Sequence, residues 1–375
     1  MVSKSSSERT FYYHIDLFRF LFSILIVYYH LLHANMIPHV TDPLYFELAG
    51  MNDYSSNIVI CFFILSGFFL YQSFQANPDR CIFEYIVSRV VRLWPLMMIA
   101  FLLEALLSGQ INWNRTLINA FFLQCSGISL EFRGMMWYVS AFFFASIFLY
   151  SLLRSFSPRK SLLIIAVITY FSCVFMVNYF DGRIGGRETV FNIINIGTLR
   201  GIAFIGTGIL LGECHIRISE MTGVMPPAPS TQKFLFLMKL VTEILCLRFL
   251  YRYFLQSRSP GNHIVLVLVF SILLLCMFSR NDPIGLFLNR KILGFGGKYA
   301  YAIYVMQGTG FLILKKTLWQ SKAFVENVPL ALLISTMIIL AIGIAGYYAV
   351  EMPCARLYQN WFRKYQNALR DKMNQ

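Results

Sequence analysis

Charged residues are scarce in this chain. Only 13% of its 375 residues are charged, whereas 57% are hydrophobic. An ordinary soluble domain has roughly 25% charged and about 45–50% apolar residues. The apolar residues also form long runs that recur from one end of the sequence to the other. This composition excludes an ordinary soluble fold and predicts an all-α, polytopic integral membrane protein.

Paired cysteines are also missing. The eight cysteines include no Cys-x-x-Cys pair, and most of them lie inside apolar runs, as Cys61, Cys173 and Cys276 do. Isolated cysteines in apolar surroundings behave as small hydrophobic residues. We therefore expect free thiols, and neither a disulfide framework nor a metal site.

Acidic residues are few, with 18 Asp and Glu against 32 Lys and Arg, so the formal net charge is +14. The basic residues are scattered singly or in pairs between the apolar runs. This pattern argues against nucleic-acid binding and is typical of topology signals in membrane proteins. A basic interior would also suit an anionic ligand.

Ten apolar stretches are candidate membrane spans, since a spanning helix needs about 20 mostly apolar residues. The first stretch contains Arg19 and no small-residue cleavage site follows it, so it is expected to remain as a helix rather than act as a signal peptide. The sequence predicts about ten helices in a single bundle. They cover approximately residues 15–33, 57–76, 91–108, 136–154, 161–180, 198–214, 234–252, 263–280, 292–315 and 330–351.

The distribution of Lys and Arg predicts that both termini are cytoplasmic. With the N-terminus inside, the inside segments hold about twice as many Lys and Arg residues as the outside loops. The loop at 34–56 has none, but it contains Asp42, Glu47 and Asp53. The expected parts are an N-terminal tail (1–14), a transmembrane domain (15–352) with a proline-rich linker near 223–230, and a C-terminal tail (353–375).

The first stretch, "FRFLFSILIVYYHLLH" (18–33), places polar groups in an apolar run. Arg19 and His30 are eleven residues apart, so on a helix they share one face and lie about 16 Å apart along the axis. A charged residue in a membrane helix costs about 2.5–3.5 kcal/mol on insertion scales, so it usually faces a partner or a wet cavity. Spacing alone leaves two interpretations, interfacial anchors or a functional cavity. Asp16 is a candidate ion partner of Arg19 in both.

The run "HIDLFRFLFSILIVYYH" (14–30) resembles the opening of the acyltransferase 3 family of integral-membrane acyltransferases. That family typically has Ile-Asp-x-x-Arg and then a histidine eleven residues after the arginine. Four further patches are similar to family motifs and occur in the same order. They are "CFFILSGFFL" (61–70), "YIVSRVVRLWP" (85–95), "LGFGGKYAYAIYVMQ" (293–307) and "YYAVEMP" (347–353). Together the five patches span almost the whole chain, and we expect a stand-alone member without a fused extra domain.

Three positions depart from the family pattern. Ala300 stands where the family often has serine, and Gln307 stands where it often has histidine. In "MWYVSAFF", Trp137 matches the family, but Phe142 occupies a position that is frequently glutamate. These differences bear on the substrate class more than on the fold.

The resemblance implies the main site residues. His30 is the matched catalytic histidine, either as a general base for an acceptor hydroxyl or as a carrier of the acyl group. Arg19 is expected to assist along the channel. Arg89 and Arg92 are three residues apart on one helix face, and guanidinium groups match phosphate oxygens bidentately. The resemblance makes them contacts for acyl-CoA, and a positive-inside anchor is the alternative.

Four further residues are expected to support or line the channel. Asp16 is the candidate partner of Arg19, and His33 is a weaker catalytic candidate that otherwise lines the channel. Ser66 is expected either to hydrogen-bond within a cavity or to pack between helices. Glu351 is expected to pair with Arg19 or an arginine of the Arg-x-x-Arg motif, or to lie at the interface.

We therefore expect a membrane O-acetyltransferase in the bacterial inner membrane. Its donor would be cytoplasmic acetyl-CoA or another acyl-CoA, with no metal, and its acceptor a hydroxyl of a cell-envelope polysaccharide or its lipid-linked sugar precursor. The expected partners are these substrates and the lipid bilayer, without nucleic acid, and a homo-oligomer is left open. The alternative is a transporter or flippase for an envelope glycan or anionic substrate. Transporters often contain internal repeats, and none is found here.

Overall fold

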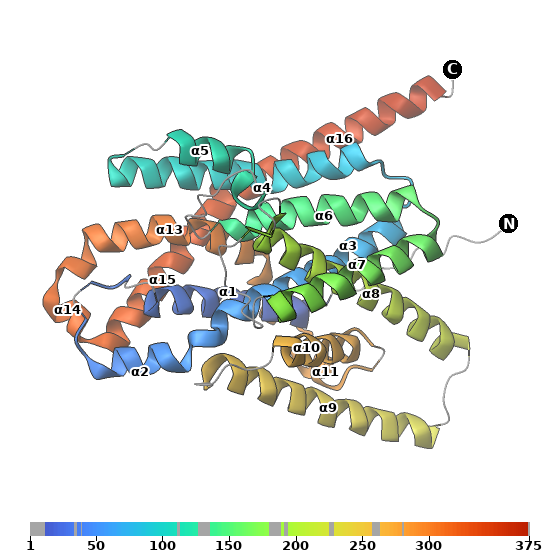
Figure 1. Cartoon of the computed structure of the whole chain (residues 1–375), viewed down its shortest axis with the longest axis horizontal. Helices are drawn as coiled ribbons and strands as arrows, with labels where there is room; N and C mark the ends of the chain where they lie inside the picture. The colour runs from blue at the N-terminus through green and yellow to red at the C-terminus, as the bar shows by residue number, and fades with distance from the viewer. Residues whose placement is uncertain are drawn as a thin grey trace.

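Helices make up nearly all of the regular structure, as Figure 1 shows. Within the described residues, the only strands are β1 (Thr189–Val190) and β2 (Ile194–Asn195), which pair antiparallel. The predicted all-α fold is therefore confirmed. The computed structural model describes residues 12–33, 36–38, 40–110, 113–126, 136–179, 189–190, 194–224, 229–256, 263–279 and 281–373.

A helix occupies each of the ten stretches predicted to span the membrane. These helices are α1 (Tyr13–Leu32), α3 (Ile58–Ala76), α4 (Ile82–Ser108), α6 (Trp137–Ser155), α7 (Pro158–Tyr179), α8 (Ile196–Val224), α9 (Pro229–Leu255), α10 (His263–Phe278), α13 (Ala300–Lys316) and α15 (Val328–Gly346). The predicted linker near 223–230 lies between α8 and α9, and its residues 225–228 lie outside the described residues.

Seven helical segments of the described chain are long and apolar enough to cross a membrane. The helices α9, α10 and α13 are not among them, because α9 contains several charged residues and the other two have only 16 and 17 residues. The count of about ten spans therefore stays a prediction, as does the cytoplasmic position of the termini. The seven segments are Tyr13–Leu32, Pro43–Ala76, Ile82–Ser108, Trp137–Ser155, Pro158–Asn178, Ile196–Thr222 and Val328–Lys364.

Shorter elements join the long helices. In Figure 1, α2 and α14 lie at the left end of the molecule, whereas α16 extends toward the right end. Asp42 caps α2, since its side chain accepts a hydrogen bond from the Leu44 N–H at 2.9 Å. The shorter elements are α2 (Pro43–Met51), η1 (Asp53–Asn57), α5 (Trp113–Ala120), η2 (Leu123–Cys125), α11 (Pro283–Leu288), α12 (Lys291–Gly294), η3 (Gly297–Tyr299), η4 (Leu318–Gln320), α14 (Lys322–Glu326), the π-helical turn η5 (Tyr347–Glu351) and α16 (Met352–Met373).

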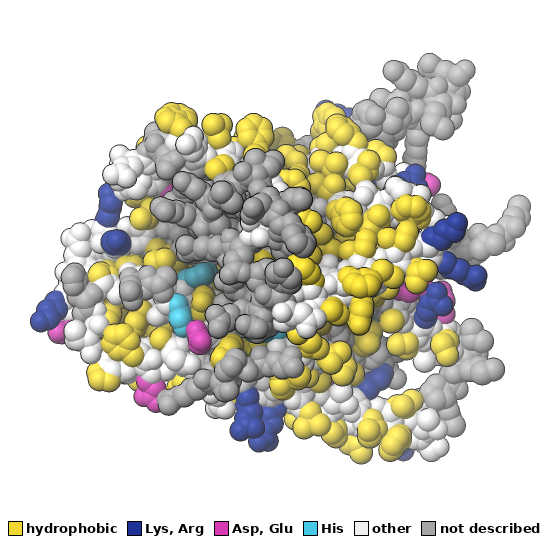
Figure 2. Space-filling view, viewed as in Figure 1, with side chains coloured by type: hydrophobic (Ala, Val, Ile, Leu, Met, Phe, Trp, Pro, Cys, Tyr) yellow, Lys and Arg dark blue, Asp and Glu magenta, His cyan; other side chains and the backbone are white. Residues whose placement is uncertain are grey.

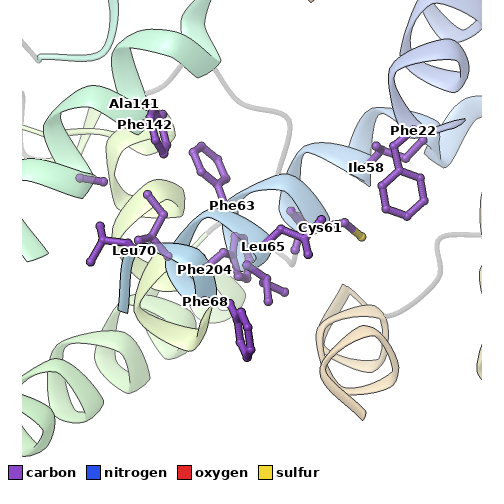
Figure 3. Packing of buried hydrophobic residues seen from close by; sticks show 14 of the residues in the cluster. Phe22, Ile58, Cys61, Phe63, Leu65, Phe68, Leu70, Ala141, Phe142 and Phe204 are labelled. Atoms are coloured by element: carbon purple, nitrogen blue, oxygen red, sulfur yellow. The ribbon is translucent and has the colours of Figure 1, made fainter. Parts of the chain in front are cut away.

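The helices α3 and α8 meet at two glycines. A Cβ added to Gly67 would overlap the backbone of Ile205, and one added to Gly208 would overlap the backbone of Ile64. Small residues at such positions let two helix backbones approach closely. Large side chains of α3 pack beside this contact together with Phe204 of α8 (Figure 3). The motif that contains Ser66 is thus held rigidly against α8.

The helix α1 lies between two hydrophobic clusters. Phe22 and Ile26 belong to the larger cluster, which includes residues of α3, α4, α6, α8 and α10. Val27 and Leu31 belong to the smaller cluster, which includes residues of α13 and α15. The helix that contains Arg19 and His30 is therefore central in the fold.

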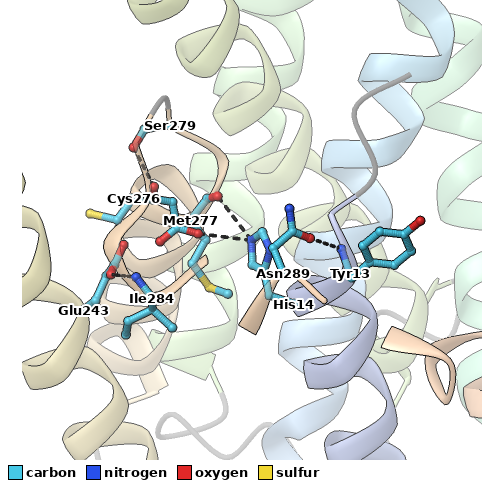
Figure 4. A network of polar contacts seen from close by, with 9 residues as sticks. Tyr13, His14, Glu243, Cys276, Met277, Ser279, Ile284 and Asn289 are labelled. Atoms are coloured by element: carbon cyan, nitrogen blue, oxygen red, sulfur yellow. Dashed lines mark hydrogen bonds and ion pairs between the residues drawn. The ribbon is translucent and has the colours of Figure 1, made fainter. Parts of the chain in front are cut away.

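A network of polar contacts fixes the first turn of α1 (Figure 4). The Tyr13 N–H donates to Asn289 Oδ1 at 2.6 Å. The His14 Nε2 atom lies 3.2 Å from the Met277 carbonyl oxygen and 3.3 Å from Asp282 Oδ2. Because these partners lie in α10 or follow it, the network sets the position of α1 relative to that part of the chain.

Hydrophobic side chains are exposed over much of the outside of the protein. On α7, Leu163, Val167, Tyr170 and Phe171 are all exposed. Figure 2 shows broad hydrophobic areas on one face, with Lys and Arg side chains mostly toward the two ends of the molecule and its lower edge. Such a surface suits contact with lipid tails, since exposed apolar patches of this extent are rare on soluble monomers.

The eight cysteines are free thiols, as predicted. Cys61, Cys125 and Cys246 are buried, whereas Cys81 and Cys214 are exposed. The buried thiols act as small hydrophobic side chains in the core.

Candidate functional site

Arg19 forms the predicted ion pair with Asp16. The Arg19 guanidinium donates to Asp16 Oδ1 at 3.0 Å, and the two residues are three apart on α1. Their side chains are 26% and 34% exposed. The pair therefore does not bury Arg19 completely, and the guanidinium remains partly accessible.

Arg92 of α4 lies beside Arg19, Arg89 and Glu351, all within electrostatic range. Glu351 in η5 interacts with both Arg92 and Arg19. Three of the sequence motifs, from α1, α4 and η5, therefore meet in one place. We call Arg19, Arg89 and Arg92 the arginine cluster. With Asp16 and Glu351 as the nearby carboxylates, the cluster keeps a net positive charge, and Arg92 stays solvent-exposed.

Arg89 is held between aromatic rings. Its guanidinium carbon lies 4.7 Å from the centroid of the Tyr85 ring and 5.5 Å from that of Phe142. Among the described residues, its buried Nε atom has no hydrogen-bond partner. Phe142 occupies the position that is often glutamate in the family, so a ring stands here where a carboxylate would neutralise the arginine. Arg89 is therefore available to an anion.

Ser66 contributes to the same region through Tyr138 of α6. The Tyr138 side chain interacts with Ser66 and lies within electrostatic range of the whole arginine cluster. Its ring packs at 4.6 Å from Phe63 and 5.6 Å from Tyr304, measured between centroids. Tyr138 thus forms a wall between α3, α6 and α13 beside the arginines.

His30 and His33 lie at the other end of α1. The His30 ring lies 5.2 Å from the Tyr29 ring, measured between centroids, and His30 interacts with His33. His33 contacts the Tyr29 carbonyl oxygen through Nδ1 at 3.0 Å, while its Nε2 lies 3.4 Å from Asp53 Oδ1. His33 therefore connects the end of α1 to η1, and His30 itself stays half-buried.

The predicted residues thus form two groups along α1. The arginine cluster gathers with Asp16, Glu351 and Ser66, whereas His30 and His33 lie about three helical turns further on. The first group has the charge to hold phosphates. The second has imidazole groups that could accept a proton. Among the described residues, no group of three or more His, Cys, Asp or Glu side chains could hold a metal ion.

Gln307 is fully buried in α13, where the family often has histidine. Neither of its amide atoms has a hydrogen-bond partner among the described residues. Next to it, a Cβ added to Gly308 would overlap the carboxylate of Glu104. Glu104 therefore lies directly against the α13 backbone.

Tyr301 and Tyr304 lie in the motif at 293–307, but sequence reasoning gave neither of them a role in the site. Tyr301 interacts with Arg92 and donates a hydrogen bond to the Leu93 carbonyl oxygen at 2.6 Å, which joins α13 to the Arg-x-x-Arg segment. Tyr304 packs against Tyr138. The spacing of Tyr301 and Tyr304 by three residues places both on one face of α13. That spacing was the available signal.

Comparisons with known proteins agree with this arrangement. The family model of the acyltransferase 3 family, described as an acyltransferase domain, matches residues 12–348. The match contains α1, the Arg-x-x-Arg segment and α13, which supply most of the two groups. Neither a comparison with curated proteins nor one with solved structures gave a match. The chain therefore belongs to the acyltransferase 3 family and is a multi-pass membrane acyltransferase.

Proposed function

We propose that this protein is an O-acetyltransferase of the bacterial inner membrane. It transfers an acetyl group from cytoplasmic acetyl-CoA to a hydroxyl of a cell-envelope polysaccharide or its lipid-linked precursor. The observation that supports this proposal most strongly is the arginine cluster. Its arginines come from α1 and α4, and they lie beside the helix face that leads to His30.

The arginine cluster suits the phosphates of the donor. A buried donor atom without a partner costs about 1–3 kcal/mol, so Arg89 gains from an incoming anion. Guanidinium groups match phosphate oxygens in bidentate geometry. The aromatic rings around Arg89 fix its plane before the ligand arrives, which lowers the conformational entropy lost on binding.

His30 suits the transfer step. The acceptor hydroxyl oxygen attacks the thioester carbonyl carbon, the carbon–sulfur bond breaks, and CoA leaves as the thiolate. His30 takes the hydroxyl proton, and the thiolate is then protonated. In the second version of the mechanism, His30 carries the acetyl group between the two substrates. The long pantetheine arm separates the phosphates of CoA from its thioester, so one donor can occupy both ends of α1.

The alternative of a transporter or flippase is not favoured. The family match is to an acyltransferase domain and covers most of the chain. A transporter could use Arg19 and His30 as a substrate or proton path, so the family match, and not these residues, argues against it.

The proposal is tested with purified protein in lipid nanodiscs and labelled acetyl-CoA. Acceptors are glycan fractions prepared from envelopes of cells with and without the gene. We expect label transfer with the wild type and its loss, by more than a hundredfold, in His30→Ala. The matched control is His215→Ala, because His215 belongs to no family motif and to neither group of site residues. Undiminished transfer by His30→Ala would remove the role proposed for His30, and translocation of a glycan without acetyl-CoA would support the alternative.

A further inference from the structure

Arg200 is a buried arginine that none of the sequence motifs includes. It lies in the first turns of α8 and is only 8% exposed. Among the described residues, its Nε atom has no hydrogen-bond partner and no carboxylate forms an ion pair with it. An isolated guanidinium is costly to bury, so such groups usually have a partner or a ligand.

The neighbours of Arg200 form a setting for an anion. Its guanidinium carbon lies 5.2 Å from the centroid of the Trp137 ring, which orients the guanidinium plane. Cys125 and His263 are within electrostatic range. The start of α8 adds the positive partial charge of a helix N-terminus. Positive charge and donor groups converge here from α8 and α10.

A series of neighbouring residues leads from Arg200 toward the end of α1 that contains His30, and His263 is the first of them. The His263 Nδ1 atom lies 2.8 Å from the Tyr253 hydroxyl, which also accepts a hydrogen bond from Asn57 at 3.2 Å. Asn57 ends η1, and η1 begins at Asp53, the partner of His33. The elements α10, α9 and η1 thus lie in succession between Arg200 and the end of α1. The electrostatic neighbours given for Arg200 are Cys125 and His263, and none of the three arginines of the arginine cluster is among them.

We propose that Arg200, with Trp137 and His263, binds an anionic group of the acceptor. The group is a phosphate or a carboxylate, so the acceptor is either a sugar linked to a lipid through a diphosphate or an acidic sugar. This inference rests on the proposed function and adds the charge of its acceptor. Anions on the donor bind the arginine cluster near the start of α1, which leaves Arg200 to the second substrate.

A binding measurement tests the site without requiring transfer. The sample is the full-length protein with Arg89→Gln and Arg92→Gln, because these substitutions remove two arginines of the donor site. The probes are inorganic pyrophosphate and glucuronate. We expect saturable binding of at least one probe and a loss of tenfold or more when Arg200→Gln is added. The matched control is Arg159→Gln, since Arg159 is an exposed arginine at the start of α7. Absence of binding, or equal binding with and without Arg200→Gln, overturns the inference.

A transfer assay distinguishes the two sources of the anion. Three acceptors share one sugar hydroxyl: a neutral disaccharide, its uronic acid form and its polyprenyl diphosphate-linked form. We expect Arg200→Gln to raise KM for one anionic form at least tenfold more than for the neutral sugar. Equal changes for all three acceptors refute the inference. If the wild type transfers to none of them while the probes still bind through Arg200, the proposed function fails and the anion site stands.

A second variant keeps the test valid if Arg200→Gln does not fold, as judged by size-exclusion chromatography. Arg200→Lys keeps the charge but loses the bidentate geometry. We expect several-fold weaker probe binding and partial recovery of the preference for the anionic acceptor. If Arg200→Lys binds the probes with wild-type affinity and changes KM equally for all acceptors, a bidentate contact between Arg200 and an anion is contradicted.

Discussion

Replacing Arg89 by glutamine tests the donor site most directly. The guanidinium is fixed by Tyr85 and Phe142, and its Nε atom lacks a partner among the described residues. A hydrogen bond to a charged group contributes about 1.5–3 kcal/mol. Since about 1.4 kcal/mol corresponds to a factor of ten, Arg89→Gln is expected to weaken CoA binding about 10- to 150-fold. Arg92 is exposed, so Arg92→Gln is expected to cost less than about tenfold.

The same substitution has a second, opposite effect on the protein without ligand. Arg89 and Arg19 both repel Arg92, so removing one positive charge relieves repulsion within the cluster. We expect Arg89→Gln to melt no lower than the wild type without CoA, and to lose the rise in melting temperature that CoA gives the wild type.

The assay is isothermal titration of CoA into protein in nanodiscs, with thermal melting in parallel. Arg159→Gln is the control, because Arg159 is exposed and outside the cluster. Arg89→Lys separates charge from geometry, since lysine keeps the charge but cannot bind bidentately. Unchanged CoA affinity in Arg89→Gln would refute the donor site and leave the arginines as topology anchors.

Three further substitutions test packing and polar contacts. Gly67→Ala places a Cβ against the Ile205 backbone and should destabilise by about 1–3 kcal/mol in thermal melts. Gly50→Ala is its control, because no atom lies within 4 Å of the added Cβ, and equal melting of the two variants would contradict the close contact. Tyr301→Phe removes the hydrogen bond to the Leu93 carbonyl and should lower the free energy of unfolding by about 1 kcal/mol. A melting temperature equal to that of the wild type would contradict this contribution. His33→Ala breaks a partly exposed contact with Asp53, so transfer should fall far less than in His30→Ala, and an equal loss would assign His33 to the chemistry.

Local geometry explains what could be predicted from the sequence. The Arg19–Asp16 pair and the shared face of Arg19 and His30 depend only on the helix repeat, and the pair is present at 3.0 Å. The meeting of Arg92 with Glu351 was one of two outcomes left open, because it depends on how helices far apart in sequence pack together. The ordered family motifs favoured a contact between Arg92 and Glu351. The helix repeat could not predict it, because the repeat describes only residues within one helix.

Contacts between helices explain what was missed. Phe142 was noted only as a departure from the family pattern, since a sequence does not show that its ring faces Arg89 across α4 and α6. Arg200 was not singled out, because a lone arginine looks the same whether it lies in a loop or, as here, is 8% exposed beside Trp137. The number of spans stays open for a related reason. Length and apolarity do not decide whether α9, α10 and α13 span the membrane. Contacts with neighbouring helices can satisfy the backbone and charged groups of a short or charged spanning helix.

The π-helical turn η5 limits which insertions and deletions the end of α15 can accept. A π-turn accommodates one extra residue, which shifts everything beyond it by about 100° relative to a regular α-helix. Glu351 ends this turn, so the extra residue determines whether its carboxylate faces Arg92 and Arg19. Deleting one residue from Tyr347–Val350 would keep α15 in register with α13 but turn Glu351 away from the arginines. The length of this five-residue segment therefore positions Glu351 independently of the identity of its other side chains.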